Sequence, residues 1–145
     1  MRTAKLEVIN SMATGQVDDL VSNLKKGEAR TGVIVAVLSK RMAEDLSDYL
    51  TEVRGQTTRY LHSDIRLSER RKIVETFERD GGVIVVVGPL KVLPKTPTVV
   101  VMDADGRGPT RSVKALQGLA ALATQRVVFC ADRFTANMRA VYSLL

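Results

Sequence analysis

The fold of this chain is decided by one stretch, VIVAVLSKRMAEDLSDYL, which runs from Val33 to Leu50. It begins with an unbroken apolar run over Val33–Leu38, which is typical of a strand buried on both faces of a parallel sheet. Apolar residues then recur at helical spacing, at Met42, Leu46, Tyr49, Leu50 and Val53. They predict an amphipathic helix over Arg41–Val53. A buried strand that leads directly into a helix is the repeating unit of α/β folds.

The same alternation of strands and helices continues along the chain. Further strands are predicted at Thr57–Leu61, Val83–Val87, Thr98–Met102 and Val127–Ala131, and helices at Gln16–Lys26, Ser68–Arg79, Arg111–Ala123 and Thr135–Leu144. Three prolines predict a loop over residues 88–97, and a Gly- and Asp-rich turn is expected over 103–109. Weak periodicity indicates a loosely held N-terminal arm over 1–14, followed by one domain over 15–145. The pattern predicts a three-layer α/β sandwich with a mostly parallel sheet of at least five strands.

Composition narrows the class of protein. The net charge of +6 and the pI of about 9.8 favour polyanionic partners, nucleic acid before membrane. The absence of Trp and the few other aromatic residues argue against a surface built on base stacking. The single cysteine, Cys130, excludes an internal disulfide and a cysteine-based metal site, and it fits a reducing cytosol. No signal-peptide core or membrane-spanning stretch is present, so we expect a cytoplasmic protein without a metal or cofactor, and Met1 favours a self-contained chain.

Two polar turns follow predicted strands and are candidates for phosphate contact. The first is Ser39–Arg41, where Ser39 is a plausible N-cap and the first amides of the helix point outward. The second is His62–Asp64, with Arg66 close behind it. Strand ends of a parallel sheet meet at one rim, where ligands bind, so these turns are expected to lie together. The alternatives are an ordinary cap with solvated cations at Ser39–Arg41 and a loop-organising role for His62.

Two long blocks also carry a family resemblance. Residues Leu38–Leu50 and Arg59–Ile65 resemble the second motor domain of the UvrB family, which supplies the helicase subunit of bacterial nucleotide excision repair. Weaker similarities lie at Gly15–Leu20, Met102–Asp105 and Ala131–Arg133. The resemblance implies a RecA-like fold, related to P-loop NTPases, and it places both blocks on the nucleic-acid side of the domain. The nucleic-acid-binding residues that we predict are Ser39, Lys40, Arg41, His62, Ser63 and Arg66.

The parts of the family that couple ATP to motion are missing from this sequence. No G-x-x-x-x-G-K-[ST] loop is present, because that loop belongs to the first motor domain. The stretch that matches the family's Q-x-x-G-R-x-x-R segment, Leu116–Thr124, contains no arginine, and nothing in the spacing supports Arg107 or Arg111 as substitutes. The segment over Pro89–Pro97 is short and proline-rich where the family has a longer coupling segment. No catalytic residue is therefore predicted.

Three functions remain open at this point. The leading hypothesis is a non-catalytic module related to DNA repair that binds nucleic acid weakly through its phosphates or docks onto a repair or helicase protein. The first alternative is a fragment or subunit of an ATP-dependent DNA helicase, which would need a separate domain with a Walker A loop. The second is a magnesium-dependent phosphotransfer enzyme that uses Asp103 and Asp105, although a capped turn explains these two carboxylates better.

Overall fold

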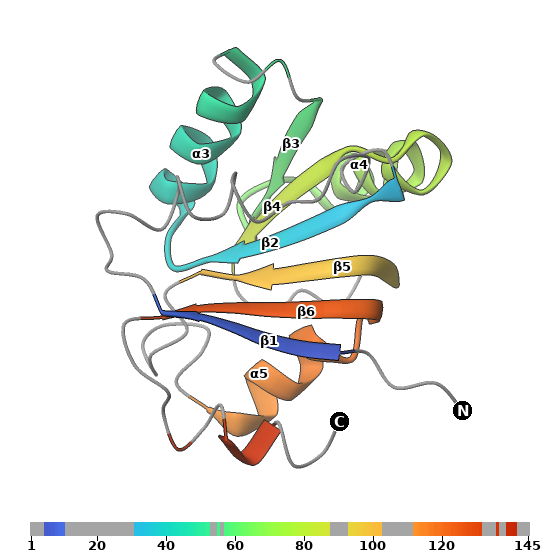
Figure 1. Cartoon of the computed structure of the whole chain (residues 1–145). Coiled ribbons are helices and arrows are strands. Elements are labelled where there is room, and N and C mark those ends of the chain that lie inside the picture. The colour runs from blue at the N-terminus through green and yellow to red at the C-terminus, as the bar shows by residue number, and fades with distance from the viewer. Residues whose placement is uncertain are drawn as a thin grey trace.

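Within the part of the chain that the structure describes, six parallel strands form one sheet, in the order β1-β6-β5-β2-β4-β3 (Figure 1). The computed structural model describes residues 5–10, 31–52, 55, 57–87, 93–102, 112–131, 136 and 139–141. The strands are β1 (Lys5–Asn10), β2 (Val33–Val37), β3 (Thr58–Leu61), β4 (Val83–Val87), β5 (Thr96–Val101) and β6 (Ala123–Ala131). The helices are α3 (Lys40–Glu52), α4 (Leu67–Asp80) and α5 (Val113–Ala120). This is the predicted α/β architecture with a parallel sheet.

Strand β2 lies in the middle of the sheet and is buried along its whole length. Its side chains alternate between the two faces, as in any strand. Ile34 and Ala36 pack into the cluster that α4 and α5 cover, whereas Val33, Val35 and Val37 pack on the side of α3. Burial on both faces explains why the sequence of β2 is continuously apolar, and it confirms the prediction made for this stretch.

Helix α3 follows β2 after two residues and lies against β3 and β4. Ala43, Leu46 and Leu50 are buried against the sheet, as the helical spacing of the apolar residues indicated. Met42 departs from the pattern, because 38% of its surface is exposed. The helix therefore presents a narrower apolar stripe than predicted, and most of its remaining surface is polar.

The N-terminal segment corrects the prediction of a loosely held arm over residues 1–14. Residues Lys5–Asn10 form β1, which pairs with β6 in parallel register and closes one edge of the sheet. A strand of this length at a sheet edge depends on the hydrogen bonds that its neighbour offers. The periodicity of residues 1–14 gives no information about β6, so the sequence pattern did not predict the strand.

Proline also misled the prediction near β5. Thr96 and Pro97 were expected in a loop, but they begin the strand. Pro97 is tolerated because the register between β5 and β6 shifts at Thr96 and Thr98, and pairing with β2 starts only at Thr98. Strand β6 likewise begins at Ala123, four residues before its predicted start, and α5 is shorter at both ends than the predicted Arg111–Ala123 helix. The predicted helix over 16–26, the turn over 103–109 and most of the closing helix lie outside the described residues.

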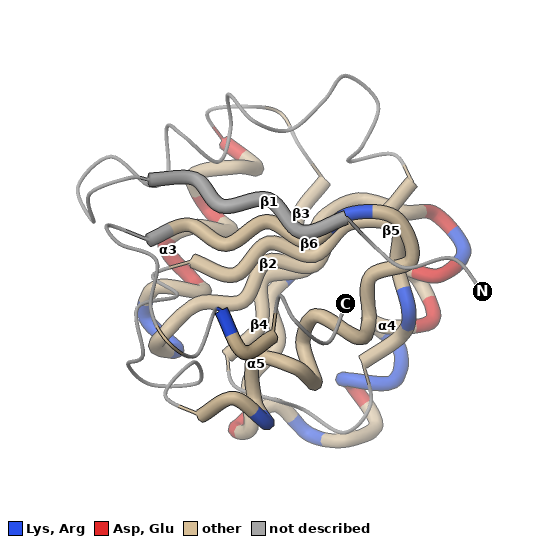
Figure 2. Tube along the Cα trace, turned by 60° about the horizontal axis from the view of Figure 1, so that its bottom comes forward, with Lys and Arg blue, Asp and Glu red and all other residues tan. Residues whose placement is uncertain are grey.

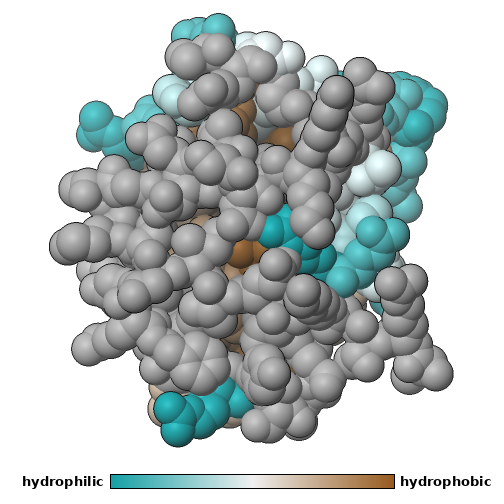
Figure 3. Space-filling model, viewed as in Figure 1, coloured by the Kyte–Doolittle hydropathy of each residue, from teal (hydrophilic) through white to brown (hydrophobic). Residues whose placement is uncertain are grey.

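Charged residues concentrate on the helices that flank the sheet. Acidic residues recur along α3, and both signs of charge alternate on α4 (Figure 2). On the face shown in Figure 3, hydrophilic residues show at the upper left and the right, near α3 and α4, and others show at the centre and the lower left. None of the described helices is long and apolar enough to cross a membrane.

Candidate nucleic-acid interface

The start of α3 has the local geometry that the sequence predicted. The Ser39 hydroxyl accepts a hydrogen bond from the Met42 backbone N–H at 3.2 Å, and the Ser39 carbonyl accepts one from Ala43 at 3.0 Å. Ser39 is therefore the N-cap. The next two amides, those of Lys40 and Arg41, have no acceptor within the helix, since the first turn of any helix lacks one. They point toward the rim where the strands end.

The cap can be tested by removing its hydroxyl. Ser39→Ala should lower the free energy of unfolding by about 1 kcal/mol, because the Met42 amide loses its acceptor. Urea unfolding followed by circular dichroism measures the difference. Ser68→Ala is the matched control, since Ser68 is exposed in the first turn of α4, where no side-chain cap forms. Equal effects of the two substitutions would contradict the assignment of the cap.

His62 shapes the turn that follows β3. Its side chain is 8% exposed, and its ring stacks on Tyr60 with the centroids 5.7 Å apart. Its Nδ1 accepts a hydrogen bond from the Asp64 N–H at 3.3 Å, and its carbonyl accepts one from Ile65 at 3.1 Å. With Nδ1 as an acceptor, the proton of the neutral ring lies on Nε2. The loop-organising role considered for His62 is thus present in the structure.

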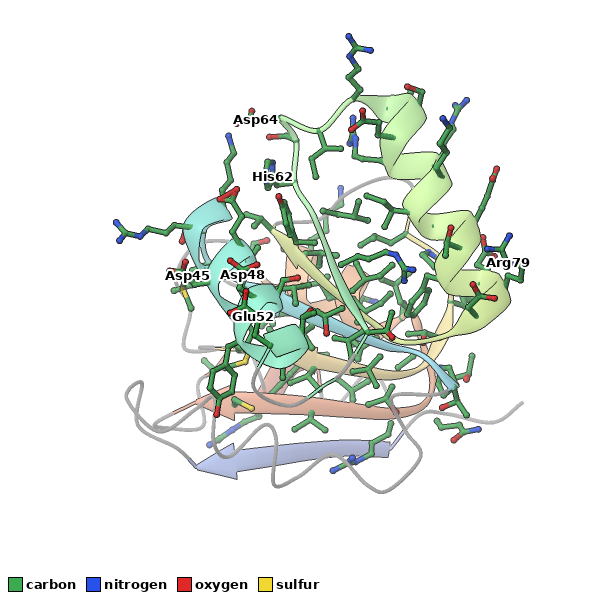
Figure 4. All side chains as sticks on the ribbon, turned by 90° about the horizontal axis from the view of Figure 1, so that it is seen from above. Asp45, Asp48, Glu52, His62, Asp64 and Arg79 are labelled. Carbon is green, nitrogen blue, oxygen red and sulfur yellow. The ribbon has the colours of Figure 1, made fainter. Side chains whose placement is uncertain are left out.

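A salt bridge joins the two polar turns across the rim. Lys40 Nζ lies 2.6 Å from Asp64 Oδ2, and the two side chains are 46% and 66% exposed. Figure 4 shows His62 and Asp64 beyond the end of β3, next to the start of α3. The hydrogen bond from Lys40, followed by the charge of the same ammonium group, lowers the pKa of Asp64 below its ordinary value of 3.8. An exposed pair of this kind adds little stability, but it fixes where the ammonium group points.

The titration of Asp64 should report this contact. A carboxyl whose pKa is depressed in the folded state stabilises the fold above its unfolded pKa and loses that contribution as the pH falls through the folded pKa. In Lys40→Met the Asp64 pKa should rise toward 3.8, as measured by carboxyl-carbon NMR. Asp80 is the internal control, because its pKa is lowered by Arg79 and should not change. An unchanged Asp64 titration would show that the salt bridge does not persist in solution.

The structure brings some of the predicted site residues together. Ser39, Lys40 and Arg41 lie at one turn, and His62, Ser63 and Arg66 at the neighbouring one. Arg66 is exposed at the N-cap position of α4, and the Arg41 guanidinium lies 3.8 Å from the Asp45 carboxylate one turn along α3. The carboxyl ends of the other predicted strands should meet at the same rim, and the residues that follow them, 88–89, 103–108 and 132–133, lie outside the described part of the chain. Arg111 also lies outside it.

Sequence reasoning missed the part that Asp64 plays at this rim. The residue was assigned to the turn of His62, but its pairing with Lys40, 24 positions away, was not predicted. The available signal was the opposite charge on two turns that a parallel sheet places at the same edge. The Asp64 carboxylate offsets the charge of Lys40, so any anion that binds there must compete with a carboxylate.

Curated proteins of similar sequence show what this chain is related to. No family model matches the chain. It is 39% identical over 145 residues to UvrABC system protein B of Chlorobium phaeobacteroides and 40% identical over 143 residues to that of Caldanaerobacter subterraneus, covering 93% and 92% of this chain. This chain is a homologue of part of UvrB. It spans about a fifth of the length of these relatives, 21% in both cases. The resemblance stated from the sequence is confirmed.

Solved structures identify the fold of this UvrB-related segment. Escherichia coli DEAD-box protein SrmB, solved bound to the regulator of ribonuclease activity A, matches with a TM-score of 0.74 at 17% identity over 100% of this chain and 87% of that one. The C-terminal domain of the DEAD-box protein Dbp5 matches with a TM-score of 0.68 at 16% identity, over 99% and 84%. The chain has the RecA-like fold of helicase C-terminal domains, as predicted.

Proposed function

We propose that this UvrB-related domain is a non-catalytic module of DNA repair that holds nucleic acid by its phosphates. The observation that carries the proposal is the start of α3, where two exposed cations, Lys40 and Arg41, stand at the positive end of a helix. Cations at that end oppose the helix dipole and would normally be disfavoured. A bound phosphate would make this arrangement favourable. The free amides, the helix dipole and the two cationic side chains would then all attract the same anion.

The neighbouring turn would extend the same contact along a nucleic-acid strand. Ser63 and Arg66 are exposed beside the Lys40–Asp64 pair, and His62 accepts hydrogen bonds from the backbone amides of Asp64 and Ile65, which lie between them. These groups reach phosphate oxygens without reading a base, so binding would depend little on sequence. The surface offers no tryptophan for base stacking. The proposal therefore predicts an electrostatic, backbone-directed interaction in the cytoplasm, alongside a repair or helicase protein.

Salt-titrated binding tests this proposal. Fluorescence anisotropy with labelled single-stranded and duplex DNA should give weak binding, with a dissociation constant on the order of 10⁻⁴ to 10⁻⁶ M near physiological salt. With three cations at the rim, the logarithm of the binding constant should fall with the logarithm of the salt concentration with a slope of about −2 to −3. An absence of binding at low salt would reject the proposal and favour protein docking.

An ATP-dependent helicase that is assembled from separate domains is the second candidate. The homology to UvrB favours it, because the chain covers only a fifth of those proteins. The arginine-free stretch Leu116–Thr124 argues against it, since losing a guanidinium at a transferring phosphate costs several orders of magnitude in rate. Nucleotide binding by the isolated chain, measured by calorimetry, would favour this candidate over ours.

A further inference from the structure

A groove of about 500 Å³ runs along the edge of the sheet opposite β1. Its floor is β3, one wall is the C-terminal half of α3, and the other wall is the first half of α4. Figure 4 shows β3 between the two helices, with Asp48 and Glu52 on α3. The groove lies on a different side of α3 from the basic first turn, and its lining includes neither Lys40 nor Arg41.

The floor of this groove is an open strand edge. β3 is the last strand of the sheet, and among the described residues β4 is its only neighbour. The Thr57 carbonyl accepts a hydrogen bond from the Val83 N–H, so the backbone of Thr57, Arg59 and Leu61 faces β4. The backbone of Tyr60 therefore faces outward, into the groove. An outward-facing donor and acceptor on an edge strand are a template for one more strand.

The charge of the groove selects the kind of strand that fits. Three exposed carboxylates, those of Asp48, Glu52 and Glu69, line it, against one cation, Arg59. The charge of these lining residues is −2, although the whole chain carries +6. A nucleic acid would be repelled from this surface, whereas lysine or arginine side chains would be attracted to it.

Arg59 adds an unmet hydrogen-bonding requirement to the same groove. Its Nη1 atom is buried and has no hydrogen-bond partner among the described residues. A buried donor without an acceptor costs free energy, and a guanidinium costs more than a neutral group. A backbone carbonyl of an added strand would supply the acceptor, while its basic side chains would face the carboxylates.

We propose that this acidic groove is a docking site for a basic, extended segment of a partner protein, which adds to the sheet as a strand beside β3. The main-chain bonds at Tyr60 provide the alignment, and the three carboxylates provide the selectivity for lysine or arginine. This site is distinct from the phosphate-binding rim, because its ligand is a basic, extended peptide segment instead of an anion.

A matched pair of triple variants tests the groove. The probe is a short, end-blocked peptide of alternating lysine and valine, and binding to the 145-residue chain is followed by fluorescence anisotropy. Asp48→Lys/Glu52→Lys/Glu69→Lys should weaken binding by at least about tenfold. Glu44→Lys/Glu75→Lys/Glu78→Lys changes the same charge on the same two helices outside the groove, and should keep most of the affinity. Equal losses in both variants, or no binding by the original chain, would overturn the proposal.

The strand geometry has its own readout. Peptide binding should slow hydrogen exchange at the Tyr60 amide, and the same peptide with glutamate in place of lysine should not. Binding that leaves this amide unprotected would overturn the added strand. Self-association of the chain that the groove variant abolishes would make the occupant a second copy, which also overturns the proposal. Lys40→Ala/Arg41→Ala should leave peptide binding unchanged, so failure here is distinguishable from failure at the DNA rim.

Discussion

Replacing Lys40 and Arg41 together with alanine should lower the affinity for single-stranded DNA by at least about tenfold at low salt, since two charged hydrogen-bonding groups are lost. The salt dependence is the sharper readout. Each phosphate contact on single-stranded DNA contributes about 0.7 to the slope of log affinity against log salt, so the slope should become shallower by about 1.4. Fluorescence anisotropy over a salt series measures both quantities.

The matched control removes the same charge at the amino ends of the strands, opposite the rim. Arg79 lies in the last turn of α4, and Lys95 precedes β5, so both lie near the amino ends of the strands (Figure 4 labels Arg79). Arg79→Ala/Lys95→Ala should reduce DNA affinity far less than the rim variant. Asp64→Asn should act in the other direction and raise the affinity by about threefold, because it releases Lys40 from its carboxylate. Equal losses of DNA affinity in the two alanine variants would show that the overall charge of the protein, and not the position of Lys40 and Arg41, determines binding.

Gly82→Ala should be among the most destabilising single substitutions in this domain, by about 2–4 kcal/mol. Gly82 has φ +98, a backbone conformation that L side chains rarely adopt, and an added Cβ would lie 2.9 Å from the Thr57 carbonyl oxygen. The same residue supports two strand starts, because its own carbonyl accepts from Val33 and the adjacent Val83 donates to Thr57. Strain there would disturb both pairings. The free energy of unfolding in urea measures the loss.

Gly118→Ala is the matched substitution, and it should raise the free energy of unfolding instead of lowering it. Gly118 is exposed within α5, and an added Cβ would meet nothing within 4 Å. Alanine in a helix is more favourable than glycine by about 0.5–1 kcal/mol, so this variant should gain stability. If both alanine variants changed stability in the same direction, the argument from backbone conformation at Gly82 would fail.

The sequence predicted the central part of the fold because burial leaves a direct trace in composition. β2 is apolar throughout since both of its faces are covered, and α3 shows helical spacing since only one face is covered. The sequence of β1 gave no comparable signal, because the strand depends on its pairing with β6, which is distant in the sequence. Pro97 indicated a loop where the structure has a strand. The register shift between β5 and β6 that accommodates this proline can be seen only in the folded sheet.

The candidate site was predictable only in part for a related reason. Ser39 and His62 lie in local turns, so their capping and loop contacts follow from residues close in the chain. The Lys40–Asp64 pair and the acidic groove join residues from separate elements. Such contacts depend on how α3, β3 and α4 pack, and a single sequence does not record this packing.

The central claim is that DNA phosphate sits at the start of α3. Chemical-shift mapping of the backbone amides during a low-salt titration with single-stranded DNA tests it most directly. We predict the largest changes at the Lys40 and Arg41 amides, with smaller ones over residues 62–66, and no change at Tyr60 in the acidic groove. Changes that are absent from Lys40 and Arg41, or that concentrate around Tyr60 and Asp48, would contradict the account.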